Sequence, residues 1–379
     1  MVHIISKTLF TLFLFMSIST LSTAETITVD IKHPSIGDYT NLQDAHDAAS
    51  DGDTILVYPS DSTYPGIVIT KSVSIIGTGM SYPSNTLKTT KISGTITFNE
   101  GSNGSLIDGF AGYFNIAINS ENVEIKRNSL DSLTINGPNS VIKLNKIREI
   151  ITNSDNTLIN KNIIERILVK SDNSGTVILQ NYIKGSSIRI IEIGDKNDIF
   201  IANNIIIQAE SGGNYYNHKH GIIASASAIS IIIQNNYIYA GFQYSYQYAL
   251  YLSSSNSYVE NNIIDQGKCT GPGYYYNIHT RGDVLNNNNG NIININPNDI
   301  FVNASEKDYH LLESSVAKGA GRNGIDIGPY GGKTPFDESI FDTSNLRPPL
   351  PTILSIESDS IVANSDQLSL TIKAKSFNE

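Results

Sequence analysis

The sequence has no tryptophan, one cysteine and three methionines among its 379 residues, and only 16% of its residues are charged. The single cysteine, Cys269, excludes an internal disulfide, so stability has to come from packing. A chain so poor in charged side chains does not resemble a helical bundle. Its formal net charge of -10 argues against nucleic acid as the main partner, and it also disfavours a polyanion unless a basic cluster or a metal offsets the repulsion.

Long apolar runs are also missing beyond the N-terminus. Residues 1–24 have the pattern of a secretory signal peptide, with Lys7, an apolar stretch over 9–21 and the small residues Ser22-Thr23-Ala24 before the expected cleavage point. No later segment is long and apolar enough to span a membrane. We therefore expect the mature chain to be exported and either secreted or associated with the cell surface.

What the chain does contain is a repeat built around asparagine. Each copy has an aliphatic residue three positions before the asparagine and another two positions after it. The seven asparagines are Asn128, Asn145, Asn162, Asn181, Asn204, Asn236 and Asn262. Their spacing varies from 17 (145 minus 128) to 32 (236 minus 204). A fixed frame with variable spacing predicts the coils of a solenoid, with loops that are free to grow between the frames.

Asparagine suits such a frame because the coils of a parallel solenoid stack about 4.8 Å apart, so equivalent residues form columns along the axis. A buried amide carries both a donor and an acceptor and can bond to the amide or backbone of the next coil. The flanking columns are nearly all isoleucine, which packs well on a pleated surface. The sequence therefore predicts a buried file of amides between two apolar columns.

The position three residues after the asparagine carries charge of alternating sign over four successive copies: Asp131, Arg148, Glu165 and Lys184. Residues 126–189 contain ten Lys and Arg against five Asp and Glu, a local excess of +5. One interpretation is a face that binds a polyanion. The interpretation we favour is an exposed ladder of ion pairs between neighbouring coils, because the alternation already accounts for four of these charges.

Both ends of the repeat carry signals of their own. Thr40-Asn41-Leu42-Gln43 has the form of a capping box, and we expect a helix over 41–49 that closes the open end of the stack. Its apolar face should consist of Leu42, Ala45, Ala48 and Ala49. Short strands should follow at 54–58, 67–69 and 73–76. Residues 341–379 are expected to form a stiff linker around 347–351 and a two-stranded tail at 353–356 and 368–372.

Two groups of motifs resemble a known family. Tyr39-Thr40-Asn41-Leu42-Gln43-Asp44-Ala45, the stretch 51–57 and Val73-Ser74-Ile75-Ile76-Gly77 look like the opening of right-handed parallel β-helix proteins of the pectin lyase-like superfamily. Residues 308–332, with Asp326-Ile327-Gly328-Pro329-Tyr330-Gly331-Gly332, are similar to the terminal segment of many secreted bacterial members. The resemblance implies an all-β solenoid, a right-handed parallel β-helix of about ten coils spanning residues 25–340.

Three connections outgrow the minimal coil, at about 208–220, 241–250 and 267–280, and they are rich in tyrosine. Sugar rings stack on aromatic faces, so these tyrosines are candidate substrate-binding residues. The candidates are Tyr215, Tyr216, Tyr244, Tyr246, Tyr274, Tyr275 and Tyr276. The stretch 242–248 also alternates with a period of two, as a half-buried strand does, so its aromatics could instead belong to the core.

The best catalytic candidates are His218, Lys219 and His220, because a histidine or lysine beside aromatic residues could transfer a proton to or from a sugar. Arg281 could hold a sugar carboxylate. Two histidines at i and i+2 could also hold a metal, yet the sequence fixes no third ligand, with His279 only a possibility, so we predict no metal and no other cofactor. The paired aspartates of glycosidases of this fold and the Trp-x-Asp-His motif of pectate lyases are both missing.

These features favour a secreted, monomeric protein that binds polysaccharide along its tyrosine-rich loops. A polysaccharide lyase or glycoside hydrolase is the first alternative. An adhesin or structural surface protein without catalysis is the second.

Overall fold

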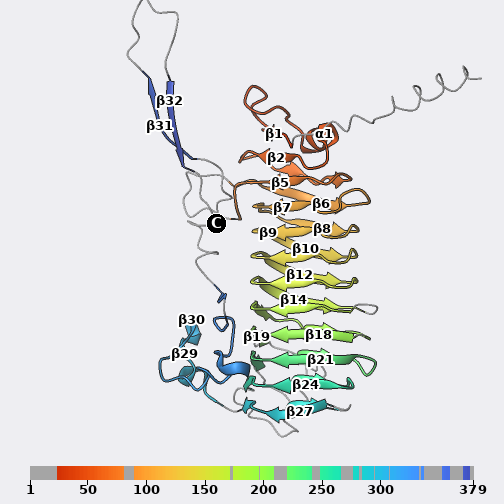
Figure 1. The fold of residues 1–379 in the computed structure, drawn as a ribbon, viewed down its shortest axis with the longest axis vertical. Helices are drawn as coiled ribbons and strands as arrows, with labels where there is room; N and C mark the ends of the chain where they lie inside the picture. Colours follow the sequence, from red (N-terminus) through yellow and green to blue (C-terminus); the bar gives the residue numbers. More distant parts are fainter. Residues whose placement is uncertain are drawn as a thin grey trace, which may run out of the picture.

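The computed structural model describes residues 24–80, 89–170, 174–195, 197–208, 220–240, 248–265, 276–280, 284–293, 295–306, 308–332, 334–336, 352–358 and 370–375. Two large sheets dominate these ranges, and every strand pairing within them is parallel. Their strands alternate along the chain and stack coil on coil into a column (Figure 1). The predicted all-β parallel β-helix is confirmed.

The first sheet has twelve strands in chain order. Its strands are β1 (Thr26–Val29), β2 (Thr54–Val57), β5 (Ser74–Ile76), β7 (Leu106–Asp108), β9 (Glu124–Lys126), β11 (Val141–Lys143), β13 (Leu158–Asn160), β15 (Val177–Leu179), β18 (Asn197–Ala202), β21 (Ile229–Gln234), β24 (Ser257–Glu260) and β27 (Val284–Asn289). Most of them are short, because each coil turns a corner after three to six residues.

The second sheet has sixteen strands. They are β3 (Tyr64–Pro65), β4 (Val68–Ile69), β6 (Ile92–Phe98), β8 (Phe114–Ile118), β10 (Ser129–Ile135), β12 (Lys146–Thr152), β14 (Ile163–Val169), β16 (Tyr182–Gly185), β17 (Arg189–Ile193), β19 (Ile205–Gln208), β20 (His220–Ala224), β22 (Tyr237–Ala240), β23 (Tyr248–Leu252), β25 (Ile263–Asp265), β26 (Tyr276–Thr280) and β28 (Ile292–Ile293). The seven-residue strands of the central coils are divided in later coils into two strands, such as β19 and β20.

The predicted asparagine column is present and fully buried. Each ladder asparagine, for example Asn145, donates from both its backbone N–H and its Nδ2 to Oδ1 of the next one, and its Nδ2 also donates to two backbone carbonyls. The file runs unbroken from Asn128 to Asn262 and continues to an eighth member, Asn291. Asn291 escaped the sequence pattern because Asn288 stands where the other copies have an aliphatic residue.

The aliphatic columns that flank the ladder also pair as predicted. On one side Ile125, Ile142, Ile159, Ile178 and Ile201 are register partners in successive coils, and each is fully buried. The column on the other side of the ladder aligns in the same way in the second sheet. A slip of one residue would turn both columns towards solvent, so the hydrophobic columns hold the register while loop lengths vary.

The N-terminal end of the column carries α1 (Leu42–Ala48) (Figure 1). The expected capping box is wrong in one detail, because Asn41 rather than Thr40 is the N-cap, and its side chain accepts from the N–H groups of Gln43 and Asp44. The buried face also differs from the expectation. Ala48 is exposed, and His46 takes its place inside.

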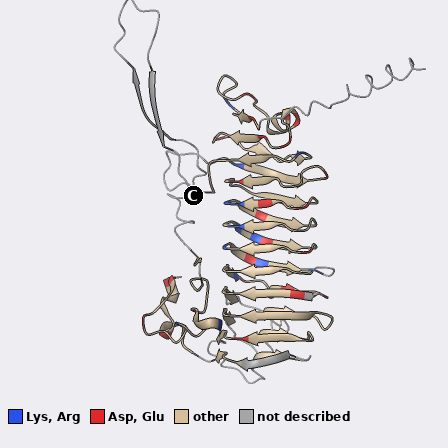
Figure 2. Cartoon of the chain, viewed as in Figure 1, with Lys and Arg blue, Asp and Glu red and all other residues tan. Residues whose placement is uncertain are grey.

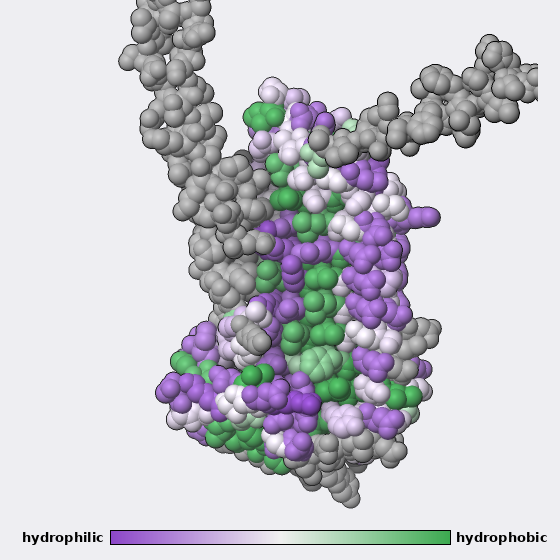
Figure 3. Space-filling view, viewed as in Figure 1, coloured by the Kyte–Doolittle hydropathy of each residue, from purple (hydrophilic) through white to green (hydrophobic). Residues whose placement is uncertain are grey.

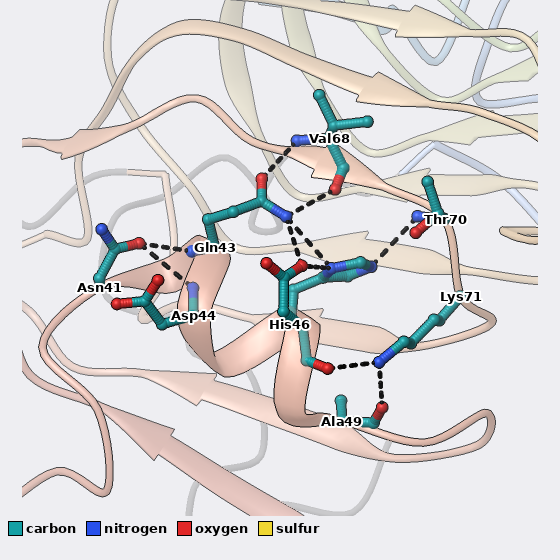
Figure 4. A network of polar contacts seen from close by, with 9 residues as sticks. Asn41, Gln43, Asp44, His46, Ala49, Val68, Thr70 and Lys71 are labelled. Carbon is teal, nitrogen blue, oxygen red and sulfur yellow. Dashed lines mark hydrogen bonds and ion pairs between the residues drawn. The ribbon is translucent and has the colours of Figure 1, made fainter.

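Polar bonds fasten this helix to the following strand region (Figure 4). Gln43 bonds both backbone groups of Val68, and Nε2 of His46 accepts the N–H of Thr70 at 3.1 Å. At the other end of the helix, Lys71 donates to the carbonyl oxygens of Asp47 and Ala49. These contacts explain why a helix of only seven residues is stable where it lies, since so short a helix is marginal alone.

The segment that follows the last coil folds back against the second sheet. It contains η1 (Pro297–Asp299), β29 (Phe301–Asn303), η2 (Ala304–Glu306), β30 (Asp308–Leu311) and η3 (Arg322–Gly324). Phe301 packs edge-on against both Tyr237 and Tyr309, and the three rings form a separate apolar cluster with neighbouring isoleucines. This cluster covers the outer face of β19, β22 and β25, so those strands are buried on both faces.

Amide side chains hold the rest of this segment, which we call the strap (residues 317–336), along one corner of the column. Asn261 donates to the carbonyl of Ala320, Asn203 to that of Gly328, and Gln180 to those of Pro329, Gly331 and Thr334. The strap therefore runs back towards the N-terminal end, one coil at a time. Further along the chain, β31 (Thr352–Ser358) and β32 (Leu370–Lys375) form an antiparallel pair.

Candidate functional site

The three long excursions start and end on neighbouring strands. They leave the column after β19, β22 and β25, which are paired side by side, and return at β20, β23 and β26, which are paired as well. The excursions themselves, residues 209–219, 241–247 and 266–275, lie outside the described residues. Their roots therefore lie on one wall of the column, formed by β20, β23 and β26 with β17 beside them.

Four rings gather on this wall: His220, Tyr248, Tyr251 and His279. His220 stacks on Tyr248 with centroids 5.7 Å apart and planes 12° from parallel, and it lies 5.2 Å from Tyr251. His279 lies 4.8 Å from Tyr248 and stacks on Tyr251 at 5.0 Å. Each histidine thus contacts both tyrosines, and contacts of this kind add about 0.5–1.5 kcal/mol per aromatic pair beyond the area that they bury.

Strand register explains how residues so far apart in sequence form this cluster. His220 is the register partner of Tyr248, and Tyr251 is the partner of His279. The tyrosines are three residues apart on β23, so the two pairs lie side by side on consecutive coils. His220 and Tyr248 are only 5% and 8% exposed, whereas Tyr251 and His279 are partly exposed. Tyr251 and His279 are therefore the part of the cluster most open to a ligand.

A charged network adjoins the rings on the preceding coils. Arg189 is the register partner of His220 and forms an ion pair with Glu192. Arg166 bonds both Glu149 at 3.2 Å and Glu192 at 3.0 Å. Arg166, Arg189 and Glu192 line a cavity of about 340 Å³ together with Ser187 and Ile188.

The two guanidinium groups and two carboxylates of this network cancel in charge. Arg189 is the most exposed of the four, at 43%, so its guanidinium is the group best placed to meet a ligand. We name the whole surface the ring wall: Arg166, Arg189, Glu192, His220, Tyr248, Tyr251 and His279. The ring wall presents aromatic faces at one end and, at the other, the guanidinium of Arg189, which can donate two hydrogen bonds to one ligand group.

The structure includes only part of the site that the sequence predicts. Of the catalytic candidates, His220 lies in the ring wall, whereas His218, Lys219 and Arg281 lie outside the described residues. The same holds for six substrate-binding candidates: Tyr215, Tyr216, Tyr244, Tyr246, Tyr274 and Tyr275. Tyr276 is described only by its backbone, which begins β26 and pairs with Tyr248.

The sequence pattern does not single out Tyr251, Arg189 or Glu192, and it indicates His279 only as a possible metal ligand. The signal that could have found Glu192, Tyr251 and His279 is the frame itself, extended beyond each excursion. Once Ile191, Ile222, Leu250 and Ile278 are aligned as one inward column, the next residue in each coil faces outward. That alignment can be made only when the residue at which each long loop returns to the column is known. The asparagine frame does not fix that residue.

No metal site is formed by the described part of the chain, in which no three His, Cys, Asp or Glu side chains cluster closely enough to hold an ion. Of the helices within the described ranges, none combines the length and the apolar character needed to cross a bilayer.

No protein-family model matches the chain, and no curated protein matches it. Among solved structures, a PL6 family polysaccharide lyase from Pseudopedobacter saltans aligns with a TM-score of 0.32 and 11% identity, over 74% of this chain and 95% of its own. The PL6 family alginate lyase AlyGC aligns with a TM-score of 0.31 and 12% identity, over 72% of this chain and 53% of its own.

The stacked parallel sheets by themselves place the chain in a structural class. It is an all-β parallel β-helix. This chain spans about half the length of AlyGC.

Proposed function

We propose that the protein is a secreted or surface-associated polysaccharide-binding protein and that the ring wall contacts the glycan. The observation that carries the proposal is the mutual packing of His220, Tyr248, Tyr251 and His279 where three tyrosine-rich excursions are rooted. Tyrosine and histidine rings offer flat faces for the C–H surfaces of sugars and polar edges for their hydroxyl groups.

The arrangement of the wall suits a chain ligand better than a compact one. Equivalent positions recur at each coil, about 4.8 Å apart, so a polymer lying along the axis would meet similar contacts at each step. Arg189 would extend this series beyond the rings, since it is in register with His220.

Replacing Tyr251 by alanine tests the proposal. Tyr251 is partly exposed and packs on both histidines, so its loss should weaken retention on an immobilised glycan at least tenfold by removing the accessible platform. Tyr258→Ala is the matched control, because Tyr258 is 37% exposed on β24 of the other sheet. A panel of neutral and acidic glycans identifies the ligand. Equal retention of the Tyr251 variant and the control would reject the ring wall.

A polysaccharide lyase is the second candidate, favoured by the pairing of Arg189 with His220 on adjacent coils. In β-elimination the imidazole would take the proton next to a sugar carboxylate that Arg189 neutralises, and the glycosidic C–O bond would break to leave an unsaturated sugar. Hydrolysis is less well supported, because Glu149 and Glu192 are both held in ion pairs with arginine. Ultraviolet absorbance of the unsaturated product, lost in His220→Gln, separates a lyase from a binding protein.

A further inference from the structure

A second groove lies on the first halves of β10, β12, β14 and β16. Its volume is about 830 Å³. It extends from Gly112 and Tyr113 at one end to Lys184, Gly185 and Ser186 at the other. Nothing in the proposed function uses it, and its lining residues differ from those of the ring wall, although Glu165 of the groove directly precedes Arg166 of the ring wall on β14.

The floor of the groove contains one column of alternating charge. Leu130, Ile147, Ile164 and Ile183 are register partners, so the residues that follow them, Asp131, Arg148, Glu165 and Lys184, also lie on successive coils. Figure 2 shows blue and red patches next to one another on these central coils. Charges of the same sign are thus two coils apart, about 10 Å.

Part of this column is already paired. Arg148 donates to both carboxylate oxygens of Asp131, from Nε at 2.5 Å and from Nη2 at 3.0 Å. Lys184 forms no ion pair among the described residues. Lys146 adds an exposed cation to the lining. The groove therefore holds three cations and two anions, a net charge of +1.

This charge distribution restricts the ligand. A polymer with an acidic group facing the groove at every sugar would place half of them beside Asp131 and Glu165, where like charges repel. The protein as a whole, at -10, adds to that repulsion. A neutral polymer would leave Lys184 without an anionic partner. One acidic group for every two sugars matches the spacing of the cations, because two strand spacings of about 4.8 Å equal roughly the length of one extended disaccharide.

Aromatic rings mark both ends of the groove. Tyr113 is 95% exposed. Ala111 forms a β-bridge with Ser129 on the next coil, and Tyr113 and Asp131 each lie two residues after one of these bridge partners. It therefore occupies the next step of the same column. At the other end Tyr182 lines the groove, with its ring 5.5 Å from that of Tyr309 in the terminal segment. The column from Tyr113 to Lys184 covers four strand spacings, or about 19 Å, enough for four sugars.

We propose that this groove is a second glycan site, which binds a linear acidic polysaccharide carrying one charged group per disaccharide. Arg148 and Lys184 contact the acidic groups, Asp131 and Glu165 accept hydrogen bonds from the hydroxyl or amide groups of the intervening sugars, and Tyr113 stacks on a terminal sugar.

The test measures affinity for three probes of similar length: hyaluronan oligosaccharides with one carboxylate per disaccharide, oligogalacturonate with one per sugar, and neutral cello-oligosaccharides. Hyaluronan should bind at least tenfold tighter than either of the others. The double variant Arg148→Gln with Lys184→Gln should lose at least tenfold for hyaluronan. Lys143→Gln, which removes a partly exposed cation on β11 of the other sheet, is the control. Glu165→Gln should raise the affinity for oligogalacturonate.

Three results would overturn the proposal: no binding of hyaluronan, equal affinity for all acidic probes, or equal loss in the double variant and the Lys143 control. Tyr113→Ala provides a second test that is independent of charge and of folding, since the side chain is almost fully exposed, and it should weaken binding severalfold. Repeating the titrations in the Tyr251→Ala background separates the two sites. If hyaluronan binding is lost in the Tyr251→Ala background, the ring wall and not the groove binds hyaluronan. The groove proposal is then rejected, whatever the outcome for the first proposal.

Discussion

Nδ2 of Asn145 donates to Oδ1 of Asn162 at 3.0 Å, and the same oxygen accepts the backbone N–H of Asn145 at 2.9 Å. One side chain thereby satisfies two buried donors of the coil before it, while its own Nδ2 bonds the carbonyls of Ile142 and Asn160. Repeated down the column, this arrangement couples each corner to the next. The hydrophobic stack can therefore turn sharply without leaving amide groups unpaired.

Replacing Asn162 by alanine should destabilise the protein by about 3 kcal/mol or more, because several buried polar groups lose their partners and each costs about 1–3 kcal/mol. The midpoint of urea unfolding measures the loss. Asn153→Ala is the matched control, since Asn153 belongs to an exposed amide file and donates to Asn136 at 2.8 Å. We expect the control to change stability by less than about 0.5 kcal/mol. Similar midpoints for the two variants would show that the buried ladder is not what stabilises the column.

Replacing Gln180 by alanine should release the strap, because its Nε2 is shared by the carbonyls of Pro329, Gly331 and Thr334 in a site where it is only 4% exposed. Limited proteolysis should then cut within 317–336 faster than in the wild type, with the column intact. Lys161→Ala tests the same corner one coil earlier, where no strap contact is found among the described residues. Unchanged cleavage in the Gln180 variant would mean that the apolar cluster alone holds the segment.

Replacing His46 by leucine should loosen the N-terminal end, because the N–H of Thr70 loses the acceptor that the buried His46 provides. Hydrogen exchange followed by mass spectrometry should show faster exchange in α1, β1 and β2, with the central coils unaffected, as expected for a stack of nearest-neighbour units. Exposed Asp44→Ala on the same helix serves for comparison. Faster exchange throughout the molecule would instead indicate that the helix is essential for the whole column.

The pair of Asp131 and Arg148 should make stability depend on pH. The hydrogen bonds from Arg148 hold the pKa of Asp131 below its ordinary value of 3.8. Because folding lowers this pKa, the stabilisation is complete above pH 3.8 and is lost as the pH falls through the lower folded value. Both side chains are well exposed, at 39% and 51%, so the effect should stay below about 1 kcal/mol.

Thermal melts of Asp131→Asn measure this effect. The variant should melt below the wild type at neutral pH, and the difference should vanish in strong acid. Glu100→Gln, at an exposed turn, is the control and should show no such convergence. A gap that persists in acid would assign the effect to packing rather than to the ion pair.

Figure 3 shows why surface function is harder to predict than the fold: in this view hydrophilic side chains flank an apolar strip along the column, and each band combines residues from many coils. Ring wall residues His220 and His279 are 59 positions apart (279 minus 220), and they belong to one cluster because each contacts both Tyr248 and Tyr251. In the sequence, the only indication of the groove is the alternating charge of Asp131, Arg148, Glu165 and Lys184. That alternation predicts a ladder of ion pairs, which is true of Arg148 with Asp131.

The sequence by itself determined the solenoid, because an aliphatic-x-x-Asn-x-aliphatic frame has one arrangement that buries both aliphatic columns and pairs every amide. It also located α1 to within a residue, since capping and apolar spacing are local signals. Only the tertiary structure decided where the terminal segment packs, that amides at Gln180, Asn203 and Asn261 fasten it, and which outward side chains share a wall. The physical reason is that inward positions obey one repeating rule, whereas contacts across coils depend on loop lengths and on a segment that lies outside the repeat.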